Sequence, residues 1–241
     1  MFYAHRSDRY KFIMCTNGRC GSTTIKRWFL KIHGRPLPSP GDFRSVHNAL
    51  QYNDPALHIS RDEFYSHPYF KFILVRNPWA RLVSFYKTLV VVNQTNSEGM
   101  GRANSFEQLV NQISKDGPKD AHTIPQSEGI QGLEFDRVIS LESIGVDMSE
   151  ICGYCGIDEF EEEKLFSSPL TDHTGDSYSK WAGERFVEDG VWPHWREFYT
   201  QEILDKVSTI YASDLIAFDY QWSDVGSEMV SGGDHGVEKK R

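Results

Sequence analysis

The sequence lacks the long apolar runs and the cysteine framework that mark several large classes of protein. No apolar stretch approaches the roughly 18 residues that a membrane-spanning helix needs. The first residues, Met1–Lys11, are polar and aromatic and do not resemble an apolar secretory signal. Four cysteines are too few for a disulfide framework in a chain of 241 residues. These absences predict a protein without a membrane span, located in the cytoplasm. They are equally compatible with a luminal protein that has lost its anchor.

The chain also lacks the excess of basic residues that a nucleic-acid-binding surface requires. Its formal net charge is -8, which argues against a broad basic face for a phosphate backbone. A small basic pocket for one phosphorylated ligand remains compatible with this charge. The hydrophobic fraction of 39% is typical of a folded globular protein. We expect a single domain over residues 1–222 and a disordered tail over 223–241, where Gly, Ser and charged residues show no periodicity.

The sequence offers little that would hold a metal ion. Cys152 and Cys155 form a lone C-x-x-C pair, whereas a zinc site needs a second pair at matching spacing. Cys15 and Cys20 do not supply that spacing. We also find no cluster of carboxylates in the sequence that could hold a metal ion. We therefore interpret Cys152 and Cys155 as two thiols on a helix and predict no metal.

Short apolar runs alternate along the chain with apolar residues at helical spacing. Each of three such runs is long enough for a buried strand, and each precedes a predicted helix. This alternation predicts a three-layer α/β fold in which helices flank a central parallel sheet. Ligands of such sheets bind beyond the carboxyl ends of the strands. The expected strands are Lys11–Thr16, Phe70–Val75 and Asp136–Leu141, and helices are expected from about Ile25, from Pro78, after Ser105, from Ile144 to a stop at Gly156, and after Thr200.

The loop after the first expected strand has the composition of an anion-binding turn. Residues 17–24 read Asn-Gly-Arg-Cys-Gly-Ser-Thr-Thr. Its glycines allow backbone N–H groups to turn toward an anion, and the start of the next helix adds partial positive charge. The arginine and the three hydroxyls favour phosphate binding over an ordinary glycine turn. The loop is not a Walker A motif, because G-x-x-x-x-G-K-[ST] and its lysine are absent.

A second loop follows the second expected strand. Arg76 stands where that strand ends, and Ser84 lies two turns into the following helix. An arginine fork suits a phosphate dianion, and a serine hydroxyl can add another hydrogen bond. Taken alone, these two residues are equally compatible with a surface charge and a serine bonded to its own helix.

Together the two loops resemble the donor-binding elements of sulfotransferases that use 3′-phosphoadenosine 5′-phosphosulfate (PAPS). Those enzymes carry a K/R-x-G-[ST]-T loop and an R-[ND]-P-x(5)-S element, matched here by Arg19–Thr24 and by Arg76, Asn77, Pro78 and Ser84. The resemblance extends to about Tyr220. The later segments His122-x-x-Pro125-Gln126 and FDRVISLESI are similar to those of the carbohydrate sulfotransferase branch.

The resemblance implies a P-loop-nucleotide-hydrolase-like fold and sulfuryl transfer from PAPS to an acceptor hydroxyl, with adenosine 3′,5′-bisphosphate (PAP) as product. It implies that the first loop holds the 5′-phosphosulfate and that Arg76 and Ser84 hold the 3′-phosphate. Arg19 is then also catalytic, because it stabilises the charge that develops on the leaving nucleotide. The implied residues of the first loop are Gly18, Arg19, Cys20, Gly21, Ser22, Thr23 and Thr24.

An alcohol acceptor needs a base, and histidine is the usual one near neutral pH. The segment His58-Ile-Ser-Arg-Asp-Glu-Phe resembles the H-[IV]-S-x-x-[DE]-F stretch of glycosaminoglycan 2-O-sulfotransferases. The histidine of that stretch acts as base, so His58 is the base that the resemblance implies. His47 is the runner-up, and His122 is a candidate for the lining of the acceptor pocket.

Two other functions stay open at this point. One is a nucleotide-dependent kinase with an atypical loop, and the other is a nucleotide-binding module that has lost its base. The acceptor is a glycan or a small molecule. We expect its pocket to be formed by residues 35–55, 91–104 and 157–195, whose tryptophans Trp181, Trp192 and Trp195 either stack on the acceptor or belong to the core.

Overall fold

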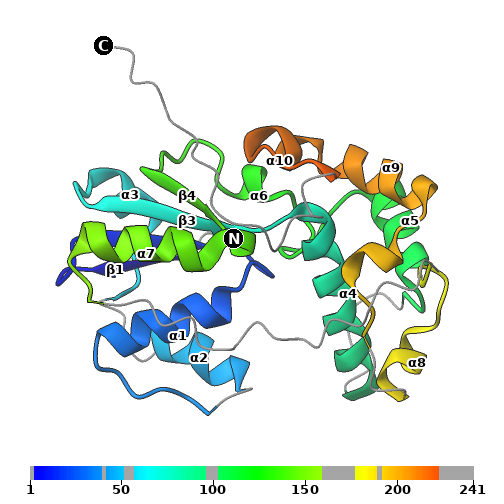
Figure 1. Ribbon diagram of the computed structural model, residues 1–241, viewed down its shortest axis with the longest axis horizontal. Helices are drawn as coiled ribbons and strands as arrows, with labels where there is room; N and C mark the ends of the chain where they lie inside the picture. The colour runs from blue at the N-terminus through cyan, green and yellow to red at the C-terminus, as the bar shows by residue number, and fades with distance from the viewer. Residues whose placement is uncertain are drawn as a thin grey trace.

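The computed structural model of the chain describes residues 3–39, 42–51, 57–95, 103–158, 177–188 and 192–222 (Figure 1). Figure 1 shows a sheet with its covering helices on one side of the molecule and a separate group of helices on the other. The sheet contains β1 (Tyr3–Ser7), β2 (Phe12–Thr16), β3 (Phe70–Val75) and β4 (Arg137–Ser140), in that spatial order.

The sheet is parallel in its centre and antiparallel at one edge. β2 pairs in parallel with β3, and β3 pairs in parallel with β4, as the sequence predicts. β1 pairs antiparallel with β2, so the expectation of a parallel sheet is wrong at this edge. β1 was not predicted, because its buried residues include the polar His5 and Ser7 and show no apolar pattern.

Alternate residues of the strands face opposite sides of the sheet. On one side Phe12, Met14 and Phe72 share an apolar cluster with residues of α1 (Ser22–Ile32), α2 (Phe43–Gln51) and α7 (Ile144–Cys155). On the other side Ile13 and Ile73 pack with Phe64 of α3 (Arg61–Ser66). Helices therefore cover both faces, which confirms the three-layer α/β fold.

The second group of helices has its own apolar core. Buried residues of this core come from α4 (Pro78–Thr95), α5 (Phe106–Asp116), α8 (Gly183–Glu188) and α9 (Gln201–Ile210), and Phe198 also belongs to it. Trp181, Trp192 and Trp195 pack against this cluster, which favours the core alternative for these three side chains. The remaining short elements are the α-helices α6 (Gln126–Gly129) and α10 (Ala212–Ala217) and the 3₁₀ helices η2 (Leu141–Ser143) and η3 (Trp195–Phe198).

Several predicted helix ends are confirmed. The Ser105 side chain accepts a hydrogen bond from the Gln108 backbone, and the Thr200 side chain accepts one from Ile203. Gly156 ends α7 with a left-handed φ of 66°. The structure also contains five helices that the sequence did not predict, namely α2, α3, α6, α8 and α10.

Two further predictions concern regions at the limits of the described chain. The predicted tail 223–241 lies outside the described residues, and so do parts of the three segments predicted to form the acceptor pocket. Among the helices that the structure describes, none is both long enough and apolar enough to span a bilayer.

Candidate active site

The first predicted loop joins the carboxyl end of β2 to the start of α1. Arg19 and Gly21 both adopt left-handed backbone conformations, with φ of 66° and 71°. Gly21 is the N-cap residue of α1 but supplies no side-chain hydrogen bond to the helix. The first turn of α1 also contains no acidic residue. The helix therefore presents backbone N–H donors and partial positive charge to this loop.

The second predicted loop joins β3 to α4 and meets the first. The Arg76 guanidinium donates from Nη1 to the Arg19 carbonyl at 3.1 Å. The Arg19 guanidinium in turn donates from Nη2 to the carbonyl and hydroxyl oxygens of Ser84, each at 3.2 Å. Asn77 caps α4 by accepting from the backbone of Trp79. The structure thus brings Arg19, Arg76 and Ser84 close together. The sequence predicts that the two loops share one edge of the sheet, but it does not predict the contact between Arg19 and Ser84.

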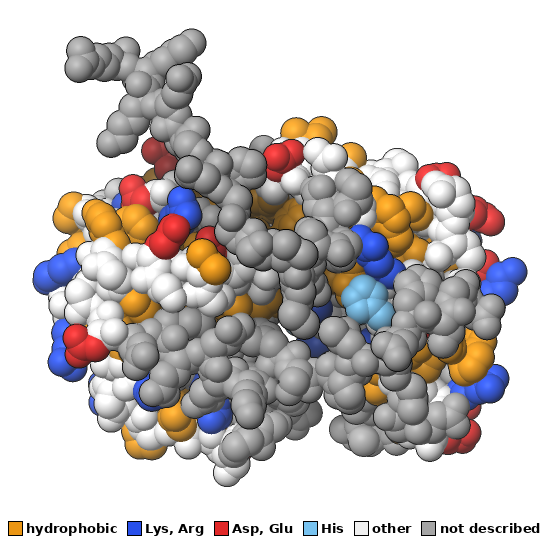
Figure 2. All heavy atoms as spheres, viewed as in Figure 1, with side chains coloured by type: hydrophobic (Ala, Val, Ile, Leu, Met, Phe, Trp, Pro, Cys, Tyr) orange, Lys and Arg blue, Asp and Glu red, His pale blue; other side chains and the backbone are white. Residues whose placement is uncertain are grey.

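Positive charge is concentrated where the two loops meet. Burial and the nearby Arg76 lower the pKa of Arg19 to about 10. Burial is also the main cause that lowers the pKa of Arg76 and that of Lys87, the latter to about 8. Within the described residues, none of Arg19, Arg76 and Arg81 forms an ion pair with a carboxylate. On the face drawn in Figure 2, Lys and Arg side chains lie beside one histidine to the right of the centre.

Two buried donors at the first loop have no partner among the described residues. These atoms are the Asn17 side-chain Nδ2 and the Arg19 Nε. A buried donor without an acceptor is costly, by about 1–3 kcal/mol. An anionic ligand would satisfy such donors and neutralise part of the arginine charge. The residues present therefore fit an anionic group such as a phosphate or a sulfate.

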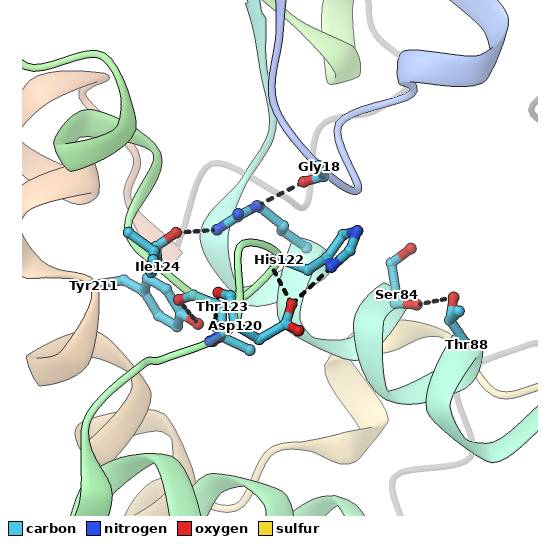
Figure 3. Close-up of polar contacts among 9 residues, drawn as sticks. Gly18, Ser84, Thr88, Asp120, His122, Thr123, Ile124 and Tyr211 are labelled. Atoms are coloured by element: carbon cyan, nitrogen blue, oxygen red, sulfur yellow. Dashed lines mark hydrogen bonds and ion pairs between the residues drawn. The ribbon is translucent and has the colours of Figure 1, made fainter. Parts of the chain in front are cut away.

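Arg81 is a site residue to which the sequence analysis assigned no role. It is 2% exposed, and it donates from Nε to the Gly18 carbonyl and from Nη1 to the Ile124 carbonyl, both at 3.0 Å. Figure 3 draws both hydrogen bonds as dashed lines that end on the labelled residues Gly18 and Ile124. Arg81 therefore joins the first loop to the segment that carries His122. Its two acceptors are backbone oxygens, which leave no signal in the sequence.

A buried network around Gln126 also escaped the sequence analysis. The Gln126 side chain accepts from the Arg76 backbone N–H at 3.0 Å and donates to the Arg76 carbonyl at 2.8 Å. Its Oε1 also accepts from the Cys20 thiol at 2.8 Å, and burial raises the pKa of that thiol to about 12. One amide side chain thus contacts both loops.

The carboxylate of Asp214 in α10 accepts hydrogen bonds from Gln126 and fixes its position. Its fully buried carboxylate accepts from the backbone and side-chain amides of Gln126 at 2.9 and 3.2 Å. It also accepts from the backbone and hydroxyl of Ser127, both at 2.8 Å. A buried carboxylate is stable only when its oxygens are well bonded, and four donors meet that need.

The three candidate histidines occupy different places. The Nδ1 atom of His47 in α2 lies 2.9 Å from the Lys26 Nζ. Burial lowers the pKa of His47 to about 4, with smaller contributions from Lys26, His122 and Arg19. His47 and His122 therefore both lie within electrostatic reach of the first loop. His58 forms an isolated bridge with His5 of β1, and the two rings are 6.0 Å apart.

A model of the sulfotransferase family matches residues 4–221 of the chain. This match includes both loops, the candidate histidines and Asp214. The chain belongs to the sulfotransferase family. Comparisons with curated proteins and with solved structures found no match. The family match supports the resemblance that the two loops indicate, without assigning a branch.

The cysteine pair of this sulfotransferase lies away from the loops. Cys152 and Cys155 are free thiols on α7, which confirms their interpretation as two thiols on a helix. Burial raises the pKa of each to about 11. Both are therefore protonated and unreactive near neutral pH.

Gly18 of the sulfotransferase allows a close approach that a larger residue prevents. A Cβ atom at this position would lie 2.7 Å from Cδ2 of His122. We expect Gly18→Ala to lower the free energy of unfolding by about 1–2 kcal/mol, as overpacking does. Denaturant unfolding measures this change, with Gly153→Ala as control because nothing lies within 4 Å of its added Cβ. The cost should disappear when His122 is also Ala, and a cost that stays would contradict the proposed clash.

Proposed function

We propose that this protein is a PAPS-dependent sulfotransferase that transfers a sulfuryl group to an acceptor hydroxyl. The observation that carries the proposal is the meeting of two loops around arginines that lack carboxylate partners among the described residues. PAPS has two anionic ends, a 5′-phosphosulfate and a 3′-phosphate. Two separate anion-binding loops, one after each of two neighbouring parallel strands, suit a ligand with this charge pattern.

In this proposal the first loop binds the 5′-phosphosulfate. Gly18, Arg19, Cys20 and Gly21 provide the turn and one guanidinium, and the start of α1 provides the hydroxyls of Ser22, Thr23 and Thr24. The Arg19 Nε has no partner among the described residues and is available to a ligand oxygen. Arg76 and Ser84 bind the 3′-phosphate.

When bound, PAPS supplies the sulfuryl group and a nucleotide that leaves with negative charge. Arg19 stabilises that charge, because a fixed guanidinium in a partly buried site needs little reorganisation during the reaction. A histidine accepts the proton of the acceptor hydroxyl. The resemblance to 2-O-sulfotransferases implies a carbohydrate hydroxyl as acceptor, and it makes His58 one candidate for this role. A small molecule is the other class of acceptor.

The first experiment is calorimetric titration with PAP, ATP and AMP. We expect selective binding of PAP. We also expect Arg76→Ala to weaken PAP binding by about 100-fold, because charge-assisted hydrogen bonds to a buried arginine contribute about 1.5–3 kcal/mol. Arg137→Ala is the control, because it removes the same charge elsewhere. Arg137 lies on the neighbouring strand β4 and forms a surface ion pair with Glu150 of α7.

The same titration, together with an assay for the release of PAP from PAPS, separates the alternative functions. Equal or tighter binding of ATP, or full PAP affinity in Arg76→Ala, would reject the donor site and favour the kinase. Tight PAP binding without any release of PAP from PAPS would favour the binding module.

A further inference from the structure

His122 is held in one orientation by a neighbouring carboxylate. The Oδ1 atom of Asp120 lies 2.7 Å from both the backbone nitrogen and the side-chain Nδ1 of His122. Thr123 closes this turn, because its hydroxyl donates to the Asp120 carbonyl and accepts from the Asp120 backbone. Figure 3 shows the aspartate and the imidazole side by side.

The segment that carries this pair is itself fixed on several sides. Arg81 donates to the Ile124 carbonyl at 3.0 Å, and Tyr211 donates to the Thr123 carbonyl at 2.7 Å. The imidazole of His122 stacks on Phe85 of α4, with ring centroids 5.7 Å apart and an angle of 13°. Such rigid support is what a catalytic side chain requires.

The free edge of the imidazole lies against the first loop. Measured from an ideal Cβ on Gly18, Cδ2 of His122 is at 2.7 Å and Nε2 is at 3.5 Å. Gly18 immediately precedes Arg19. Within the described residues Nε2 has no hydrogen-bond partner, and the side chain is 43% exposed. An incoming acceptor can therefore reach it.

Hydrogen bonding decides which imidazole nitrogen carries the proton. A carboxylate only accepts hydrogen bonds, so Asp120 keeps the proton of a neutral His122 on Nδ1 and leaves a lone pair on Nε2. His47 has the opposite arrangement, because the Lys26 ammonium donates to its Nδ1 and the proton resides on Nε2. Of the two histidines near the first loop, His122 is therefore the one whose unprotonated nitrogen has no hydrogen-bond partner among the described residues.

We propose that His122, oriented by Asp120, is the general base of the reaction, an inference that rests on the proposed function. The acceptor oxygen forms a bond to sulfur while the bond between sulfur and the 5′-phosphate oxygen breaks. The electron pair of the broken bond leaves with the nucleotide. The acceptor proton passes to Nε2 of His122 and from there to solvent, while Asp120 stabilises the imidazolium.

The test uses PAPS as donor and measures the release of PAP at enzyme excess. Water serves as the universal acceptor, and a panel of desulfated glycosaminoglycans and phenols is run in parallel. His122→Gln should lower the rate by about 100-fold, the usual contribution of a general base. PAP affinity measured by calorimetry should change by less than about twofold, because in this proposal His122 takes no part in donor binding.

Two further readouts separate a base from a structural residue. The pH profile of the rate should differ between the wild type and His122→Gln, because only the wild type has an imidazole that can accept the proton of the acceptor. Asp120→Asn should give an intermediate rate, since its amide oxygen can accept from Nδ1 but cannot stabilise an imidazolium. His67→Gln is the control, because this imidazole bonds to Arg6 beside Tyr69 on the α3 side of the sheet.

The outcomes distinguish this inference from the proposed function. Failure of the wild type to bind PAP rejects the function itself. If PAP binds but His122→Gln keeps the wild-type rate and pH profile, the assignment of His122 is wrong. It is also wrong if His58→Gln alone abolishes turnover. A last outcome is a wild type that binds PAP but releases none from PAPS, with water or with any acceptor. That result would reject His122 as a general base, since a base at the sulfuryl group should activate water.

Discussion

Replacing Arg19 with alanine is expected to lower the rate of PAP release from PAPS by about 1,000-fold, the upper range for removing one donor to a developing oxyanion. Arg19 remains charged near neutral pH although burial lowers its pKa to about 10. Its side chain is anchored on Ser84, and its Nε has no partner among the described residues. The measurement is the single-turnover rate at saturating PAPS.

The backbone at position 19 makes this substitution a fair comparison. Both arginine and alanine bear the strain of the left-handed φ of 66°. The variant therefore changes charge and contacts but not the penalty of the turn. Arg19→Lys should recover part of the rate, because a lysine keeps the charge but loses the fork. A rate within tenfold of the wild type in Arg19→Ala would show that Arg19 does not stabilise the leaving nucleotide.

Asp214→Asn should produce the largest loss of stability. The substitution keeps the shape of the side chain but turns one acceptor into a donor that faces the N–H groups of Gln126 or Ser127. We expect the free energy of unfolding to fall by about 3 kcal/mol. This loss corresponds to about 6–12 °C in Tm for a domain of this size. PAP affinity should fall as well, because Gln126 positions Arg76.

Asp205→Asn on α9 is the matched control for this experiment. Its side chain is exposed and accepts a hydrogen bond from Gln201 at 2.8 Å. Loss of such a surface contact should change stability by less than about 0.5 kcal/mol. Equal effects of the two substitutions would mean that the buried carboxylate does not support the site.

The sequence predicted the parts of the site that depend on neighbouring residues. Each loop directly follows a buried strand and precedes a helix, so local patterns placed Arg19 and Arg76 at the same edge of the sheet. The contact of Arg19 with Ser84 was not predicted, because Ser84 was assigned to the 3′-phosphate. β1 was missed because a short edge strand with buried His5 and Ser7 lacks the apolar alternation that marks a strand.

The supporting contacts could not be predicted, because they join residues that are far apart in the chain. Gln126 is 50 positions from Arg76 and 88 positions from Asp214. Arg81 and Tyr211 bind backbone carbonyls, which every residue possesses. The orientation of His122 depends on the carboxylate of Asp120, two residues earlier, a spacing that is common in turns. Only the structure shows that this imidazole lies against Gly18 of the first loop.

The position of Asp214 near the end of the described chain bears on how the protein matures during synthesis. Domains form as units while the chain leaves the ribosome. Both loops emerge long before α10, the helix whose carboxylate holds Gln126 against Arg76. A nascent chain that ends before α10 therefore contains every residue proposed to touch the nucleotide without the support that aligns them. The support for the two loops is therefore completed only when α10 has been synthesised.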